Sequence, residues 1–312
     1  MRLKSITIGE YKNLKDFTLN FNTTCFIDIF VGKNGSGKSN LFEAIILIFK
    51  HLIEFRKGST SKIENYAISY DLEGKEHIYK WNGTTLNYNG KARKSLTASS
   101  LPDNILVYYS GHNDTVSTII DEYQEHFSKR IKKADIDESR KFLGIGSGYK
   151  SILLGVLLLQ PDSSKAKTYV CEKLGITQQD INISLTLKRP VFAKKDFIID
   201  RIDETTFYWG TKGITLEFLK KIVSSIKDSF SHAGLYDSKK DMYQIKIDGA
   251  LYRTVFKGTQ VTEHFRFFDN LNTLEMLQEM SAEFVLADSS KATIHQFQTS
   301  GLVFDVTDSL SL

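Results

Sequence analysis

One stretch near the N-terminus constrains this chain more than any other. Residues 32–39 read Gly-Lys-Asn-Gly-Ser-Gly-Lys-Ser and match GxxxxGK[ST] at every fixed position. Glycines let the backbone curl around an anion without a Cβ in the way, and successive backbone N–H groups then point at phosphate oxygens. In this pattern Lys38 reaches the β- and γ-phosphates, and the Ser39 hydroxyl binds Mg²⁺. The pattern predicts a bound nucleoside triphosphate, with ATP and Mg²⁺ as the expected ligands.

The residues on both sides of this loop favour the same interpretation. Cys25–Val31 is a nearly continuous apolar run, which is typical of a strand buried on both faces of a parallel sheet. Residues 40–55 are apolar around much of a helical circumference, so we expect a well-buried helix. A glycine-rich turn without a ligand is the alternative. The order strand, loop, helix is the one that phosphate binding requires, and it favours the ligand.

Hydrophobic periodicity gives a coarse layout for the rest of the chain. Residues 3–9 and 17–21 alternate apolar and polar side chains and predict an antiparallel strand pair. Residues 63–90 resemble a small β-meander. Farther on we expect strands at 104–109, 182–187, 197–202, 243–247, 251–256 and 296–306, and helices at 115–133, 149–160, 216–230 and 263–286.

These elements predict an α/β protein. We expect a P-loop NTPase with a mixed sheet, N-terminal antiparallel strands, and an α+β insertion or second region. The expected division is an N-terminal lobe at residues 1–114 and a mixed α+β region at 115–312, which we expect to be incomplete.

Composition narrows the class of protein. The hydrophobic fraction of 41% and charged fraction of 25% are ordinary for a globular protein, and the net charge of +4 permits a polyanionic partner without requiring one. The two cysteines, Cys25 and Cys171, belong to no metal-binding pattern, which favours reduced thiols in a cytoplasmic protein. The longest apolar run, 152–159, is far shorter than the roughly 20 residues of a membrane span, so we expect no membrane partner.

Three segments together resemble a known group of ATPases. They are Tyr11-Lys12-Asn13-Leu14, then Val31-Gly-Lys-Asn-Gly-Ser-Gly-Lys-Ser-Asn40, then Leu41-Phe42-Glu43-Ala44-Ile45. This opening resembles the RecF/SMC/OLD branch of the ABC-type superfamily, and within it the "AAA family" ATPases associated with restriction and anti-phage defence. The likeness covers residues 1–55 closely and is weak beyond them.

The resemblance adds the turn before the loop to the expected site, because in such proteins the basic turn residue lies near the nucleotide. The predicted nucleotide-binding residues are Lys12, Asn13, Gly32, Lys33, Asn34, Gly35, Ser36, Gly37, Lys38, Ser39 and Asn40, with Ser39 as the Mg²⁺ ligand.

Complete members of this branch also carry an LSxGE-like signature and a Walker B strand that ends in Asp-Glu, and neither pattern is found. Glu122 follows Asp121 but lies on the predicted amphipathic helix, while Asp200 ends an apolar run without a second acid. Residues 110–113 follow the strand where a Q-loop glutamine would stand, but contain no glutamine. We therefore expect either the N-terminal part of a longer ATPase or a protein that binds ATP without turning it over.

Two functions follow from these expectations. The first is an ATP-binding module, ABC- or SMC-like, that couples ATP binding and hydrolysis to a DNA-related task such as DNA repair or to antiviral defence. It would act as an ATPase once completed by a C-terminal half or a partner. The alternative is an ATP-sensing module that lacks hydrolysis and regulates an effector such as a nuclease.

We expect a homodimer or higher oligomer. DNA is a candidate partner because Lys129–Lys133 and Lys188–Arg189 form basic patches, although solvated surface is the alternative for both. A GTPase is disfavoured because no NKxD sequence occurs.

Overall fold

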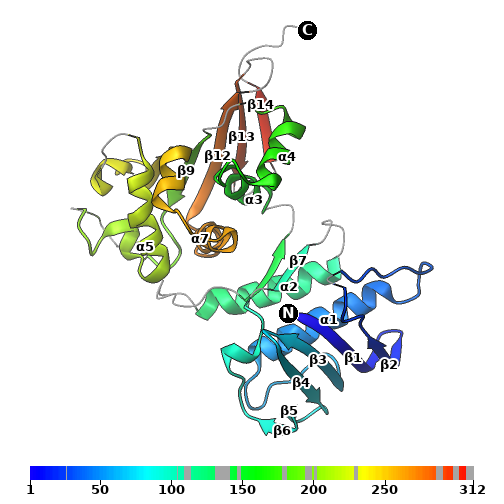
Figure 1. The fold of residues 1–312 in the computed structure, drawn as a ribbon. Helices are drawn as coiled ribbons and strands as arrows, with labels where there is room; N and C mark the ends of the chain where they lie inside the picture. Colours follow the sequence, from blue (N-terminus) through cyan, green and yellow to red (C-terminus); the bar gives the residue numbers. More distant parts are fainter. Residues whose placement is uncertain are drawn as a thin grey trace. The chain divides into compact units, whose positions relative to one another are not determined.

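The computed structural model describes residues 1–25, 27–103, 105–108, 114–130, 141–145, 149–177, 181–193, 199, 202–227, 231–285, 291–297 and 302–306. The chain forms two compact units (Figure 1). The first contains Met1–Tyr123 and Arg140–Ile145, and the second contains Gln124–Ser139 and Gly146–Leu312. The division predicted after residue 114 stays a prediction.

The first unit is built on a six-stranded antiparallel sheet with the strand order β2-β1-β3-β4-β5-β6. Its strands are β1 (Arg2–Tyr11), β2 (Leu14–Asn20), β3 (Tyr66–Leu72), β4 (Lys75–Trp81), β5 (Leu86–Tyr88) and β6 (Lys91–Arg93). The predicted N-terminal pair is confirmed, with Ile8 opposite Phe17, and β3–β6 form the predicted meander. The alternating apolar residues of β1 and β3 supply one buried face, with Ile6 and Ile68 almost fully covered.

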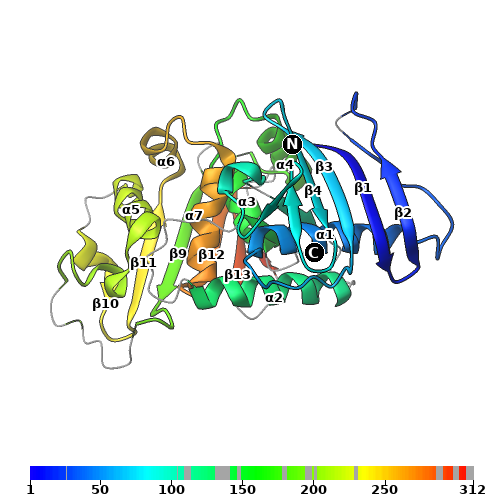
Figure 2. The same cartoon turned by 90° about the horizontal axis from the view of Figure 1, so that it is seen from below.

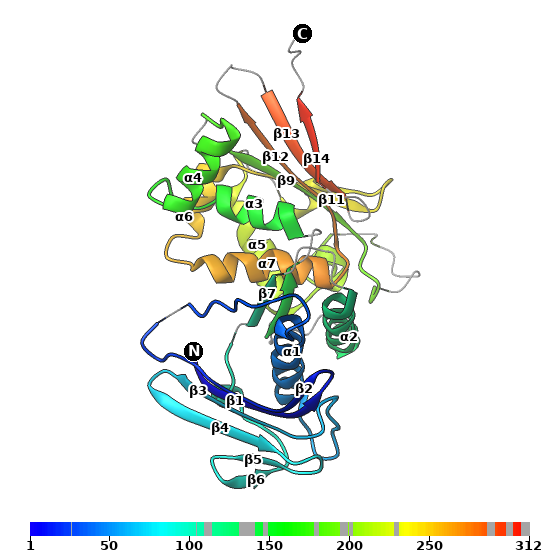
Figure 3. The same cartoon turned by 90° about the vertical axis from the view of Figure 1, so that its right-hand side faces the viewer.

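Helix α1 (Lys38–Glu54) lies against this face of the sheet (Figure 3). It confirms the helix predicted after the loop, and its buried residues include Leu47, Ile48 and Leu52. The ring of Phe49 lies 5.9 Å from that of Tyr70 on β3. Burial of this apolar stripe fixes the helix, and so fixes the position of the loop that precedes it.

The first unit also contains two parallel strands, β7 (Ile105–Tyr108) and β8 (Phe142–Ile145), and the start of helix α2 (Asp114–Arg130), whose residues after Tyr123 belong to the second unit. The helix predicted at 115–133 is confirmed, and so is a strand near 104–109. The prediction that this strand is buried is wrong, because none of its residues is fully buried, and Leu106 and Tyr108 are 55% and 79% exposed. The described strands therefore form two antiparallel sheets and a separate parallel pair rather than one mixed sheet.

The predicted buried strand at Cys25–Val31 is wrong for the described residues. Residues 27–31 adopt no strand, and Ile27, Ile29 and Val31 are 77%, 81% and 90% exposed. A strand buried on both faces of a parallel sheet needs hydrogen-bonded neighbours, and no described strand pairs with this segment. Within residues 27–31, Phe30 is anchored by edge contacts of its ring with Phe21 and Phe42.

The second unit contains another antiparallel sheet, with the order β10-β11-β9-β12-β13-β14, whose first strands are clearest in Figure 2. Its strands are β9 (Asn182–Lys188), β10 (Tyr236–Asp237), β11 (Met242–Ile247), β12 (Leu277–Val285), β13 (Lys291–Phe297) and β14 (Leu302–Val306). Its helices are α3 (Lys150–Leu158), α4 (Lys165–Leu174), α5 (Gly213–Ile222), α6 (Gly249–Val255) and α7 (Val261–Thr273).

Two sequence predictions in this unit are wrong. The helix predicted at 263–286 ends at Thr273, because Glu275 adopts φ 56° and turns the chain into β12. The strand predicted at 251–256 is helix α6, which begins after Asp248, whose carboxylate accepts a hydrogen bond from the Leu251 backbone N–H over 2.9 Å. None of the helices in the described ranges has the length and apolarity needed to cross a bilayer.

His51, on the buried face of α1, gives a prediction about pH. Its Nδ1 is hydrogen-bonded to the Tyr66 hydroxyl at 2.8 Å, while Nε2 is buried with no partner among the described residues. Burial lowers the pKa of His51 from its ordinary 6.5 to about 4. As the pH falls, His51 is therefore protonated in the unfolded chain before it is protonated in the folded one. The free energy of unfolding is highest above pH 6.5, where His51 is neutral in both states, and it decreases as the pH falls toward 4.

We expect the free energy of unfolding of the first unit to fall by about 1–2 kcal/mol between pH 7 and pH 5. The decrease should be much smaller in His51→Phe. The chain has two tryptophans, so in a Trp209→Phe background Trp81 reports urea unfolding of the first unit alone. An equal decrease with and without His51 would show that this histidine does not carry the effect.

Candidate functional site

The loop at residues 32–39 is an exposed turn between the extended segment and α1. The Ser36 backbone N–H donates to the Lys33 carbonyl oxygen over 3.2 Å, which closes the turn. Gly35 and Gly37 adopt φ 81° and 93°, a region that side chains rarely tolerate. A Cβ on Gly35 would meet no atom within 4 Å, so the backbone there is open to a ligand.

Lys38 is the first residue of α1, and its ammonium lies over the loop. It donates to the carbonyl oxygens of Gly32 at 2.6 Å and Lys33 at 2.9 Å. Ser39 follows on the exposed side, and its hydroxyl makes no hydrogen bond within the described part of the chain. The first backbone N–H groups of a 17-residue helix point in the same direction and carry its partial positive charge.

The turn between β1 and β2 is tied to this loop by Asn13. The Asn13 Nδ2 donates to the Gly35 carbonyl oxygen at 3.4 Å, and its Oδ1 accepts from Asn40 Nδ2 at 2.6 Å. A Cβ on Gly37 would lie a tight 3.1 Å from the Asn13 amide, and the φ of 93° at this position also favours glycine. The structure thus ties Asn13 to the loop and to Asn40, and Lys12 is the neighbour of Asn13 in the same turn. That any of these residues contacts a nucleotide stays a prediction.

Glu43 is a charged residue of this region that the sequence reasoning left without a role. It lies on α1 and is 4% exposed. Lys12 Nζ forms an ion pair with its Oε2, and the Tyr11 hydroxyl donates to the same oxygen over 3.1 Å. Burial and the adjacent carboxylate raise the pKa of Tyr11 to about 12. The signal in the sequence was an acid placed among the apolar residues of a buried helix.

The loop region is suited to a polyphosphate with a divalent cation. Three lysines, Lys12, Lys33 and Lys38, outnumber the single buried carboxylate of Glu43. The Ser39 hydroxyl at the helix start and the open glycine backbone add groups of the kind that Mg²⁺ and phosphate oxygens bind.

The acidic residues considered from sequence do not join this site. Glu122 lies on α2, where its carboxylate pairs with Lys50 and Lys62 at 3.0 Å each. Hydrogen bonds from these two lysines lower the pKa of Glu122. Glu122 therefore takes part in a structural ion pair. Asp200 and residues 110–113 lie outside the described residues. Within the described ranges no group of three or more His, Cys, Asp or Glu is arranged to hold a metal ion.

The two basic patches considered from sequence are Lys188–Arg189 and Lys129–Lys133. The arginine of the first has an acidic partner, and most of the second lies outside the described residues. Arg189 Nε donates to Asp241 Oδ2 at 2.6 Å, and Asp241 also accepts from Trp209 and Tyr236, so this arginine takes part in an ion pair within the second unit. The patch at 129–133 extends beyond the end of α2 at Arg130, and its last residues lie outside the described ranges.

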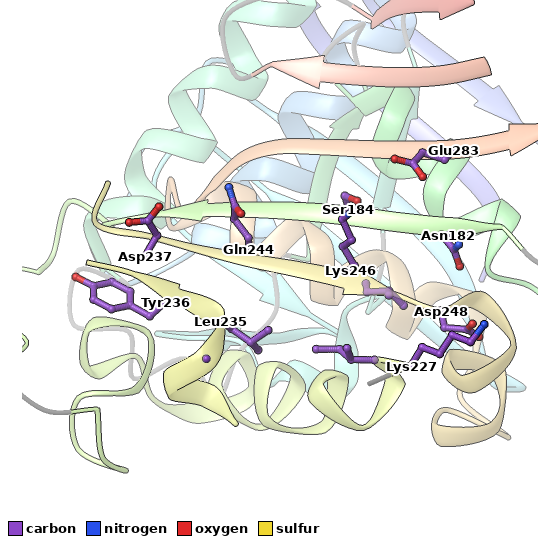
Figure 4. Close-up of a pocket in the computed structure, with 13 residues that line it drawn as sticks. Asn182, Ser184, Lys227, Leu235, Tyr236, Asp237, Gln244, Lys246, Asp248 and Glu283 are labelled. Atoms are coloured by element: carbon purple, nitrogen blue, oxygen red, sulfur yellow. The ribbon is translucent and has the colours of Figure 1, made fainter. Parts of the chain in front are cut away.

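A pocket of about 480 Å³ lies in the second unit, on the polar face of β9 and β11 (Figure 4). Two lysines, Lys227 and Lys246, line it together with three carboxylates, those of Asp237, Asp248 and Glu283. Negative side chains outnumber positive ones, which opposes a triphosphate. The loop of the first unit is therefore the better nucleotide site.

Comparison with known proteins agrees with this assignment. The family model described as "AAA ATPase domain" matches residues 1–293. The chain belongs to this family. Together with the relatives below, the match makes it a P-loop ATPase of the RecF/SMC branch, an ATP-binding module of ABC/SMC-like type with an α/β fold.

Curated relatives match a short part of the chain. They include DNA replication and repair protein RecF from Phocaeicola vulgatus, 36% identical over 73 residues, covering 23% of this chain and 18% of the relative. RecF from Leptospira interrogans is 37% identical over 76 residues, covering 24% and 20%. RecF from Clostridioides difficile is 30% identical over 92 residues, covering 24% of each chain. The chain thus spans about a fifth of the length of these relatives, and no solved structure matches it.

Proposed function

We propose that this chain binds ATP with Mg²⁺ at the loop 32–39 and uses the bound state to control a DNA-related or anti-phage defence task. The observation that carries the proposal is the loop itself, with its open glycine backbone, Lys38 and Ser39 at the start of a firmly packed helix.

The residues have distinct roles in this proposal. The backbone N–H groups of the loop and Lys38 hold the phosphates, and Ser39 provides a hydroxyl to Mg²⁺. Lys12 and Asn13 approach from the β1–β2 turn, while Asn40 positions Asn13. When bound, Mg²⁺ neutralises phosphate charge and orients the phosphate oxygens.

The task is proposed from the relatives, whose printed name is DNA replication and repair protein RecF. We propose that the active species is a homodimer or higher oligomer, with DNA and an effector nuclease as candidate partners. The exposed apolar residues Ile27, Ile29 and Val31 beside the loop support an assembled state, because side chains of this kind are usually covered in working proteins.

The test is equilibrium binding of Mg-ATP, Mg-ADP and inorganic phosphate to the full chain, followed by ATP turnover across a range of protein concentrations. We expect Mg-ATP to bind at micromolar concentration and phosphate alone to bind far more weakly. Turnover that rises faster than linearly would indicate a competent dimer. Tight binding without turnover would favour the sensing module that regulates a partner, and no binding of Mg-ATP would refute the proposal.

A further inference from the structure

The Glu43 carboxylate is a buried charge beside a loop that is proposed to take an anion. Its side chain is 5% exposed, and an acid of this kind is rarely buried without a partner. Both partners described for it, Lys12 and Tyr11, come from the end of β1 and the turn that follows. Through these two partners Glu43 connects α1 to the β1–β2 hairpin.

The position of Glu43 along α1 links this pair to the loop. It follows Lys38 by five residues, which is about 7.5 Å of rise along the helix axis. Asn13, the neighbour of Lys12, reaches the loop through the Gly35 carbonyl oxygen. The turn therefore contacts α1 at Glu43 and the loop at Gly35 through two adjacent residues.

Lys12 retains capacity to bind a ligand while it is paired. Its side chain is 42% exposed, and an ammonium has three N–H donors, of which Glu43 takes one. Its backbone adopts φ 52°, an uncommon conformation that persists where the surroundings fix it. The Lys12 ammonium also lies 5.5 Å from the centre of the Tyr11 ring. These contacts hold a long, otherwise mobile side chain in one place.

We propose that Glu43 is a positioning residue for nucleotide binding: it fixes the Lys12 ammonium beside the loop, where the free donors of Lys12 contact the phosphates of ATP. This inference rests on the proposed function of the loop. In this arrangement a negatively charged residue strengthens the binding of an anion, because it orders the cation that contacts it.

Electrostatics alone predicts the opposite effect, and this difference makes the proposal testable. If Glu43 acted only through its charge, replacing it with glutamine would remove a repulsion and tighten ATP binding. If it acts by holding Lys12, the same replacement should weaken binding.

The first experiment is a double-mutant cycle on Mg-ATP affinity with Glu43→Gln, Lys12→Met and the double variant. We expect each single variant to weaken binding by about tenfold, and the double variant to be no weaker than Lys12→Met. Glu10→Gln, which removes an exposed carboxylate on β1, is the matched control and should leave affinity unchanged. Equal or tighter binding by Glu43→Gln, or multiplied effects in the double variant, would overturn the proposal.

The second experiment needs no nucleotide and separates this inference from the proposed function. A brief pulse of an amine-acetylating reagent, mapped by mass spectrometry, should label Lys12 slowly in the parent and several-fold faster in Glu43→Gln. The exposed Lys57 should react equally in both proteins. Equal labelling of Lys12 would refute the positioning role even if ATP binds. Faster labelling in a chain that fails to bind ATP would refute only the function proposed for the loop. If Glu43→Gln does not fold, Glu43→Asp keeps the charge on a shorter arm and should show a smaller change in the same direction.

Discussion

Replacing Lys38 with alanine is expected to weaken Mg-ATP binding by about 100-fold, because each charge-assisted hydrogen bond to a phosphate is worth roughly 1.5–3 kcal/mol. In the ligand-free chain this ammonium is already held over the loop by the carbonyl oxygens of Gly32 and Lys33. Little ordering is then required when the phosphates arrive. Titration of a fluorescent ATP analogue, checked by calorimetry, measures the change.

Lys57→Ala is the matched control for Lys38→Ala, because Lys57 is an exposed lysine of the same unit and lies outside the predicted site. Its affinity should equal that of the parent. A thermal or urea measurement gives an independent test, since a ligand at 100 times its dissociation constant stabilises the folded state by about 2.7 kcal/mol. The parent should show this gain and Lys38→Ala should not. Affinity within twofold of the parent would mean that ATP binds at another site.

The loop and its helix could be predicted because local sequence determines them. Glycine spacing, the lysine and the serine specify phosphate chemistry, while the apolar circumference of α1 specifies burial. The β1–β2 pair is also determined by local sequence, since two strands with alternating apolar residues and a short turn between them can pair in few registers. Glu43 belongs to a segment that carries the resemblance, but its contacts could not be predicted from the sequence. Its partners Tyr11 and Lys12 lie more than 30 residues away and contact it only when the hairpin packs on α1.

Three elements were predicted wrongly because their structure depends on features that the hydrophobic pattern of the segment does not contain. The apolar run Cys25–Val31 has the composition of a central strand, but strand formation depends on neighbours that the run itself does not specify. Residues 274–285 carry apolar side chains at spacings that suit a helix and a strand alike, and the left-handed backbone at Glu275 decided for β12. For α6 the deciding feature was a cap at Asp248, a single side chain that periodicity does not detect.

Replacing Phe49 with alanine is expected to lower the free energy of unfolding of the first unit by about 3–5 kcal/mol. Its ring is 2% exposed and packs near Tyr70, so truncation leaves a cavity between α1 and β3. Urea unfolding followed by Trp81 fluorescence in the Trp209→Phe background measures this. Phe49→Leu keeps most of the volume and should lose less, which guards against a variant that does not fold.

Phe42→Ala is the matched comparison, because it removes the same ring from the same helix on its exposed side. Phe42 is 48% exposed and contacts Phe30 at 5.3 Å between ring centres, so its loss should cost about 1 kcal/mol or less. Equal losses at the two positions would mean that α1 is not packed on the sheet through the Phe49 face. That result would also remove the support for the loop geometry, since the loop begins α1 and takes its position from the packing of that helix. A large difference would instead show that α1 is held on the sheet through the Phe49 face, which also fixes the position of the loop.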